Sequence, residues 1–130
     1  MNAIRIILRS IAIAALMLIG HAPAQHALAH ASLMSSQPED GAVLSAPPER
    51  IILIFNEPVS PLRMQLINRQ GKPVPLTDIV QHDNTVIVHL PDAITQGTHG
   101  VSWRVVSTDG HPVGGTLIFS VGQADAGGSF

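Results

Sequence analysis

The sequence predicts an all-β fold, a Greek-key β-barrel or β-sandwich of about seven strands. Three observations support this fold class. Short runs rich in Ile, Val, Leu and Phe alternate with clusters of Pro, Gly and Asp, a pattern typical of strands and turns. No apolar period of 3.6 residues extends over a useful length after residue 30, so helices are not expected there. The 130 residues suffice for one domain, and the part after the leading segment matches the roughly 100 residues of a sandwich domain.

The strand pattern is clearest at residues 50–55, RIILIF, where both alternating faces are apolar. Such a strand is expected to lie inside a sheet and to be packed on both faces. Prolines limit residues 73–75 to an edge position, and Asp, Gly and Pro residues end most of the other strands. We expect those other strands at residues 31–36, 64–69, 85–90, 100–106 and 116–121.

The first 29 residues have the composition of an export signal. Arg5 and Arg9 supply a positive start, and residues 11–19 form an apolar core that is too short to span a bilayer. Ala27-Leu28-Ala29 is a small-x-small cleavage site. We therefore expect cleavage after Ala29 and export to the periplasm. The chain then divides into a signal peptide over 1–29, a β-domain over 30–122 and a disordered tail over 123–130.

The composition excludes several classes of function. Removal of residues 1–29 takes away two of the seven basic residues and none of the nine acidic residues, so the net charge becomes more negative than −2. An acidic surface without a basic run argues against binding to nucleic acid. The chain has no cysteine, which excludes disulfides, thiolate metal sites and thiol catalysis.

Two side chains that can bind a metal stand one residue apart in the segment STDGHP at residues 107–112. In an extended backbone, alternation places Asp109 and His111 on the same face, and Gly110 between them adds no bulk. A carboxylate and an imidazole directed at one point form half of a metal site. Most Asp-Gly-His triplets are surface turns, so this pair alone is a weak signal. A complete metal site needs further ligands from elsewhere in the chain.

Cleavage after Ala29 would make His30 the first residue of the mature chain. A free α-amine beside its own imidazole is a bidentate chelator, because the amine nitrogen and Nδ1 close a six-membered ring on one metal ion. Before cleavage that nitrogen belongs to an amide and is a poor ligand. With Asp109 and His111, the chelate gives a nitrogen and oxygen donor set that suits Cu(II), although Zn(II) accepts similar ligands. The simpler alternative is that a histidine stands at this position by chance.

Four motifs follow one another along nearly the whole mature chain. They are His30-Ala-Ser-Leu, Ser36-x-Pro38-x-x-Gly41, Leu53-x-Phe55-x-Glu57-Pro58 and Trp103-Arg-Val-Val-Ser-x-Asp109-Gly-His111-Pro112. Together they resemble the CopC family of exported copper-resistance proteins, and the last motif is the most specific. The resemblance implies a cupredoxin-like or Ig-like β-barrel that binds one Cu(II) ion at the mature N terminus.

The resemblance also assigns roles to individual residues. His30 would supply its amine and imidazole, His111 an imidazole and Asp109 a carboxylate. Glu57 matches an acidic position near the family's site, and we expect it to act as a supporting or weak axial partner. An inner-membrane copper transporter of the CopD type is the implied partner.

The mature chain departs from the methionine-rich members of this family. It has only Met34 and Met64, which cannot form a cluster of thioether ligands. Because Cu(I) prefers soft ligands, we expect no dedicated Cu(I) site.

Three functions are compatible with these residues. The first is a monomeric copper carrier or buffer without enzymatic activity. The second is a copper monooxygenase with a histidine brace, which would need an open coordination position and an aromatic substrate face. One Trp, three Phe and no Tyr make such a face small, and Asp109 would occupy a coordination position. The third is an Ig-like interaction module without a metal. N-terminal sequencing and copper titration of the mature protein would distinguish them.

Overall fold

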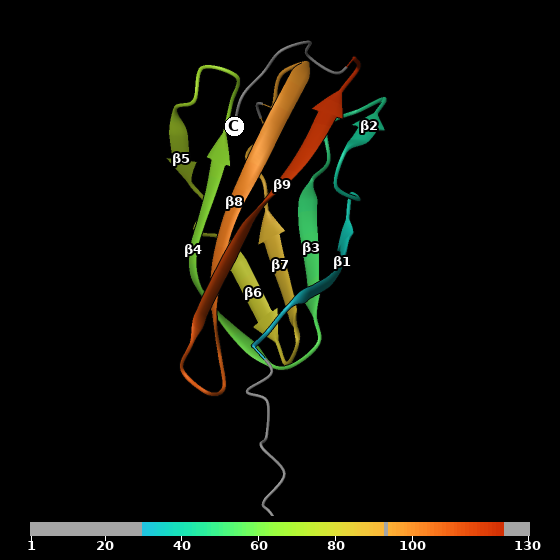
Figure 1. The fold of residues 1–130 in the computed structure, drawn as a ribbon. Helices are drawn as coiled ribbons and strands as arrows, with labels where there is room; N and C mark the ends of the chain where they lie inside the picture. The colour runs from blue at the N-terminus through green and yellow to red at the C-terminus, as the bar shows by residue number, and fades with distance from the viewer. Residues whose placement is uncertain (1–29, 93, 124–130) are drawn as a thin grey trace, which may run out of the picture.

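The structure is a computed structural model that describes residues 30–92 and 94–123. The predicted signal peptide lies outside the described residues, as does the predicted tail after residue 123. The described residues form nine strands (Figure 1). They are β1 (Leu33–Gln37), β2 (Ala42–Leu44), β3 (Arg50–Phe55), β4 (Val59–Ile67), β5 (Pro73–Pro75), β6 (Ile79–His82), β7 (Thr85–His89), β8 (Gly97–Ser107) and β9 (Pro112–Val121).

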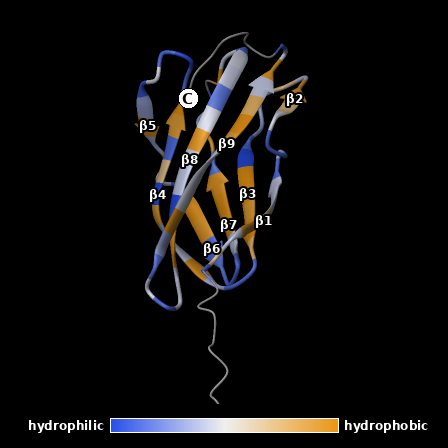
Figure 2. Ribbon diagram, viewed as in Figure 1, coloured by the Kyte–Doolittle hydropathy of each residue, from blue (hydrophilic) through white to orange (hydrophobic). Residues whose placement is uncertain are grey.

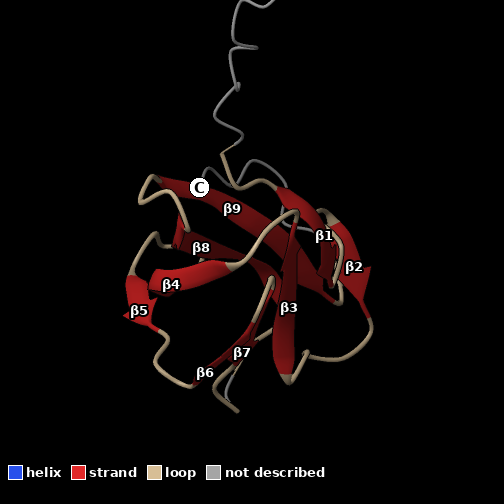
Figure 3. Cartoon of the chain, turned by 90° about the horizontal axis from the view of Figure 1, so that it is seen from below, coloured by secondary structure: helices blue, strands red, loops and turns tan. Residues whose placement is uncertain are grey.

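The strands form two sheets that lie one over the other, as the view along the strands shows (Figure 3). One sheet has the order β1-β3-β7-β6 and the other the order β2-β9-β8-β4-β5. All neighbours are antiparallel except β2 and β9, which are parallel. The chain crosses between the sheets several times, for example from β3 to β4 and from β7 to β8, as in Greek-key sandwiches. The predicted fold class is confirmed, with nine strands in place of about seven.

β3 occupies the interior position that its sequence predicts, between β1 and β7. Alternation along the strand buries Ile51, Leu53 and Phe55 in the space between the sheets. Ile52 and Ile54 on the opposite face are only partly buried. The expectation that β3 is packed on both faces is therefore wrong, because a two-layer sandwich covers one face of each sheet.

The rest of the core comes from both sheets, and Figure 2 shows apolar residues along β3 and β7. Full burial of one such side chain stabilises the fold by about 1.5–3 kcal/mol. The rings of Trp103 in β8 and Phe55 in β3 meet edge to face across the sheets, with 5.3 Å between their centroids. Further buried side chains are Val59, Met64, Val86, Val88, Val101, Val105, Leu117, Phe119 and Val121. This core holds the strand ends, and hence the loops, in place.

The described residues contain no helix that is long and apolar enough to cross a membrane.

Candidate metal centre

The start of the described chain is fixed at one end of the sandwich, at the bottom of Figure 1. The backbone N–H of Ser32 donates to Oδ1 of Asn56 at 2.7 Å, and the N–H of Asn56 donates to the Ser32 carbonyl oxygen at 3.1 Å. Ala31 between this pair and His30 is 4 % exposed. The backbone is therefore held immediately after His30, whose own side chain is 55 % exposed.

Asn56 belongs to the connection between β3 and β4, which is itself held by the turn between β6 and β7. The side-chain amide of Asn84 donates to the Phe55 carbonyl oxygen at 2.9 Å, and the N–H of Phe55 donates to the Asn84 carbonyl oxygen at 2.9 Å. The N–H of Val59 donates to the Asp83 carbonyl oxygen at 3.2 Å. Both loops thus support the segment that carries His30.

The other half of the site lies in residues 108–111, which connect β8 to β9 at the same end of the sandwich (Figure 1). The N–H of Ser107 donates to the His111 carbonyl oxygen at 3.2 Å, and the N–H of Gly110 donates to the Ser107 carbonyl oxygen at 3.0 Å. Gly110 has a φ of 82°, a left-handed conformation that a side chain would strain. The backbone here is a turn. Strand alternation therefore does not explain why Asp109 and His111 face the same point.

Hydrogen bonds within the turn place Asp109. Ser107 Oγ donates to Oδ1 of Asp109, and the N–H of His111 donates to the same oxygen at 3.2 Å. The hydrogen bond from the Ser107 hydroxyl contributes most to holding the pKa of Asp109 well below its usual range. Hydrogen bonds from His111 lower this pKa further. Asp109 therefore carries a negative charge at neutral pH.

His30, Asp109 and His111 come together as the sequence predicts. One ligand atom from each of them lies within 4.8 Å of the other two. Oδ2 of Asp109 is 3.0 Å from Nδ1 of His111 and 4.0 Å from Nδ1 of His30. The two imidazole rings meet edge to face, with 5.0 Å between their centroids. Across the part of the chain that the structure describes, these residues form the one group of three or more His, Asp or Glu side chains with this spacing.

Glu57 lies in the β3–β4 connection but is not a member of this group. Its side chain is partly buried, and Oε1 is buried without a hydrogen-bond partner among the described residues. An unpaired buried oxygen is costly, so Glu57 has unused capacity to accept a hydrogen bond. Its predicted role as a supporting or weak axial partner stays a prediction.

The remaining described histidines are not members of the group. His82 is exposed in β6, and His89 is partly buried in β7. His99 is buried in β8, where it stacks on Phe119 and its Nε2–H donates to the Thr95 carbonyl oxygen at 2.8 Å. These three side chains therefore have structural or solvent-facing positions.

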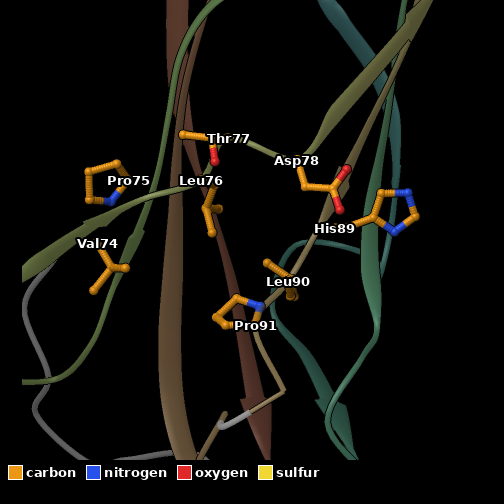
Figure 4. A pocket seen from close by; sticks show the side chains of 8 residues that line it. All are labelled: Val74, Pro75, Leu76, Thr77, Asp78, His89, Leu90 and Pro91. Atoms are coloured by element: carbon orange, nitrogen blue, oxygen red, sulfur yellow. The ribbon is translucent and has the colours of Figure 1, made fainter.

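The structure also has a shallow groove between β5 and the end of β7 (Figure 4). Asp78 and His89 lie on one side of this groove, and Val74 and Pro75 on the other. It lies toward the end of the sandwich that is remote from His111, because His89 pairs with Arg50 at the start of β3. The groove therefore has no part in the site formed by His30, Asp109 and His111.

The geometry defines a class of protein: a small β-sandwich with two imidazoles and one carboxylate gathered at one end. Two nitrogen ligands and one oxygen ligand suit a borderline divalent ion such as Cu(II) or Zn(II). The sequence profile of the CopC domain matches residues 33–122. The chain therefore belongs to the CopC family, which confirms the resemblance seen in its motifs.

Individual relatives agree with this assignment. Copper resistance protein C of Xanthomonas campestris pv. juglandis is 33% identical over 123 residues, which cover 87% of this chain and 96% of the relative. Copper transport protein CutJ of Bacillus subtilis is 33% identical over 104 residues, 76% of this chain, but the chain spans only 19% of that relative's length. The crystal structure of CopC from Methylosinus trichosporium OB3b superimposes with a TM-score of 0.62 at 26% identity, over 71% of this chain and 93% of the other.

Proposed function

We propose that the mature chain binds one Cu(II) ion through His30, Asp109 and His111, and that it carries or buffers copper in the periplasm. The observation that supports this most strongly is that three ligand atoms from residues far apart in the sequence lie within 4.8 Å of one another. The family and the names of the relatives, which are copper resistance and copper transport proteins, support copper as the cargo.

The proposal depends on removal of the signal peptide. Cleavage after Ala29 would give His30 a free amine, and this amine and Nδ1 would chelate the ion together. Nδ1 is the His30 nitrogen that faces Oδ2 of Asp109, at 4.0 Å. The orientation of the ring therefore suits the chelate. Residues 30–122 would be the copper-binding domain.

An open site favours a carrier over an enzyme. The side chains of His30 and His111 are 55 % and 51 % exposed. Solvent can reach the ion, and so could the donor groups of a partner, which would take the ion over by exchanging one ligand at a time. A membrane copper transporter of the CopD type is the recipient or donor that we propose. We further propose that the chain acts as a monomer and catalyses no reaction, because Asp109 fills a position that a monooxygenase would leave open.

The copper content of the purified mature protein tests this function. The protein is saturated with Cu(II), passed through a desalting column and analysed for copper and for its N-terminal residue. We expect one copper ion per chain that begins with His30, and substantially less copper with His111→Ala. A mature wild-type protein that retains no copper would contradict the proposal.

A further inference from the structure

Ser107 is a buried residue whose hydroxyl lies within reach of both Asp109 and His111 in the turn between β8 and β9. It ends β8 and is only 5 % exposed. Pairing with Val59 in β4 fixes its backbone on one side, and its N–H donates to the His111 carbonyl oxygen at 3.2 Å on the other. Its hydroxyl therefore has little freedom to move. Strand pairing provides a rigid support of the kind that precise ligand positions require.

The hydroxyl has two acceptors within reach and one proton to donate. Ser107 Oγ lies close to Oδ1 of Asp109, and 3.2 Å from the His111 carbonyl oxygen. The carboxylate is the stronger acceptor because it is charged. The carbonyl oxygen already accepts the N–H of Ser107 itself. The hydroxyl proton therefore goes to Asp109.

The two oxygens of Asp109 consequently have different surroundings. Oδ1 accepts the Ser107 hydroxyl and the N–H of His111, and these two donors use both of its lone pairs. Oδ2 faces the imidazoles, with Nδ1 of His111 at 3.0 Å and Nδ1 of His30 at 4.0 Å. Rotation of the carboxylate to present both oxygens to one ion would break both hydrogen bonds to Oδ1.

We infer that Ser107 is a positioning residue that makes Asp109 a one-oxygen ligand, which binds the metal ion through Oδ2 alone. The inference rests on the proposed function and adds a rule for the geometry of that site. Without the hydroxyl, the carboxylate rotates. Either Oδ1 then binds the ion together with Oδ2, or Oδ2 no longer binds it. Both changes alter the electronic structure of bound Cu(II) as well as its affinity.

A matched pair of variants isolates the hydroxyl. Ser107→Thr keeps the oxygen and Ser107→Val replaces it with a methyl group of the same shape, so the two proteins share the same steric change. We expect Ser107→Val and Ser107→Ala to bind Cu(II) about tenfold more weakly than wild type, the smaller effect typical of a lost supporting residue. Their electron paramagnetic resonance and visible spectra should also change. Ser107→Thr should restore both the affinity and the spectra.

Thr108→Ala, an exposed change at the neighbouring position, should leave affinity and spectra as in wild type. The free energy of unfolding without copper measures how much each change affects the fold itself. A purely structural role for Ser107 would lower this free energy without changing the copper spectra. Wild-type affinity and spectra in both Ser107→Val and Ser107→Ala would overturn the inference.

A measurement on the wild-type protein decides the matter even if these variants fail to fold. Infrared difference spectra, with and without Cu(II), are recorded on protein that contains ¹³C-carboxyl aspartate. A one-oxygen ligand gives widely separated asymmetric and symmetric carboxylate stretches, and Asp109→Asn should remove this signal. Closely spaced stretches, typical of a two-oxygen ligand, would overturn the inference while leaving copper binding intact. Failure of the wild-type protein to bind Cu(II) at all would instead contradict the proposed function, and the inference with it.

Discussion

Asp109 contacts His111 twice, once through the side chain and once through the backbone. Oδ2 lies 3.0 Å from Nδ1 of the imidazole, and Oδ1 accepts the backbone N–H at 3.2 Å. Contacts within the turn thus hold the carboxylate and the imidazole together. Ligands that are already in place lose less conformational freedom when an ion binds. His30, which is distant in the sequence, completes the group at the same end of the sandwich.

The first prediction ranks the ligands. His111→Ala should weaken Cu(II) binding by more than about 100-fold, because it removes a ligand atom and not a supporting group. Glu57→Ala should cost less, about tenfold or below, because Glu57 lies outside the three-residue group. Isothermal titration against a competing chelator measures both affinities.

Two other histidines provide the controls for this ranking. His82→Ala and His89→Ala should leave the copper spectrum unchanged, because neither residue belongs to the three-residue group. A loss with Glu57→Ala as large as that with His111→Ala would make Glu57 a ligand and our assignment wrong.

The second prediction concerns pH. Free imidazole and α-amino groups lose their protons near about 6.5 and about 7.7–8.0, so protons compete with copper for the nitrogen ligands. Affinity should fall at least about 100-fold between about pH 7 and about pH 5, since at least one proton must leave per ion bound. Asp109 should not contribute to this slope, because the Ser107 hydroxyl lowers its pKa and keeps it ionised throughout. An affinity that is constant over this range, measured by competition titration, would show that the nitrogen ligands are not used.

The third prediction concerns the oxidation state of copper. The proposed ligands are nitrogen and oxygen atoms, and Cu(I) prefers sulfur. Met34 lies in β1 with 66 % of its surface exposed, whereas Met64 is buried in the core. Reduction with ascorbate should therefore release the ion to a Cu(I) chelator. A Cu(I) affinity close to that for Cu(II) at neutral pH would reveal an additional donor, and Met34→Ala would be the first variant to test.

The fourth prediction concerns stability. A Cβ added at Gly115 in β9 would lie 2.7 Å from Cζ2 of Trp103, so Gly115→Ala must displace the indole ring. We expect a loss of about 1–3 kcal/mol in the free energy of unfolding, as for other overpacked sites. Trp103 is the only tryptophan, so its fluorescence reports both the displacement and the unfolding transition. Thr116→Ala, at the exposed neighbouring position, should change stability and emission much less.

The sequence predicted the strands that have strong local patterns and missed those that depend on distant partners. β3 begins and ends where the strand was predicted, at Arg50 and Phe55. β2 was not predicted, because its three residues form a strand only by pairing in parallel with β9. The polar residues Gln81 and His82 were predicted to lie in a break between strands. They belong to β6, which pairs along its length with β7.

The site shows a similar division. The residue types of His30, Asp109 and His111 indicated a metal site, and the structure brings the three side chains together. The reason for their convergence was only partly visible in the sequence. Asp109 and His111 face one point through a turn with a left-handed glycine, and not through strand alternation. Ser107 and Asn56, which fix the two halves of the site, had no local signal beyond their suitability for turns.

Copper binding by two forms of the same chain, which differ only at the N terminus, tests the central claim most directly. One form begins with His30, and the other keeps a methionine before it, so that the His30 nitrogen is an amide. We predict that the added methionine weakens Cu(II) binding at least about 100-fold, more than the loss of a supporting residue, because it removes the amine and breaks the six-membered chelate. Equal affinities of the two forms would contradict the N-terminal copper site.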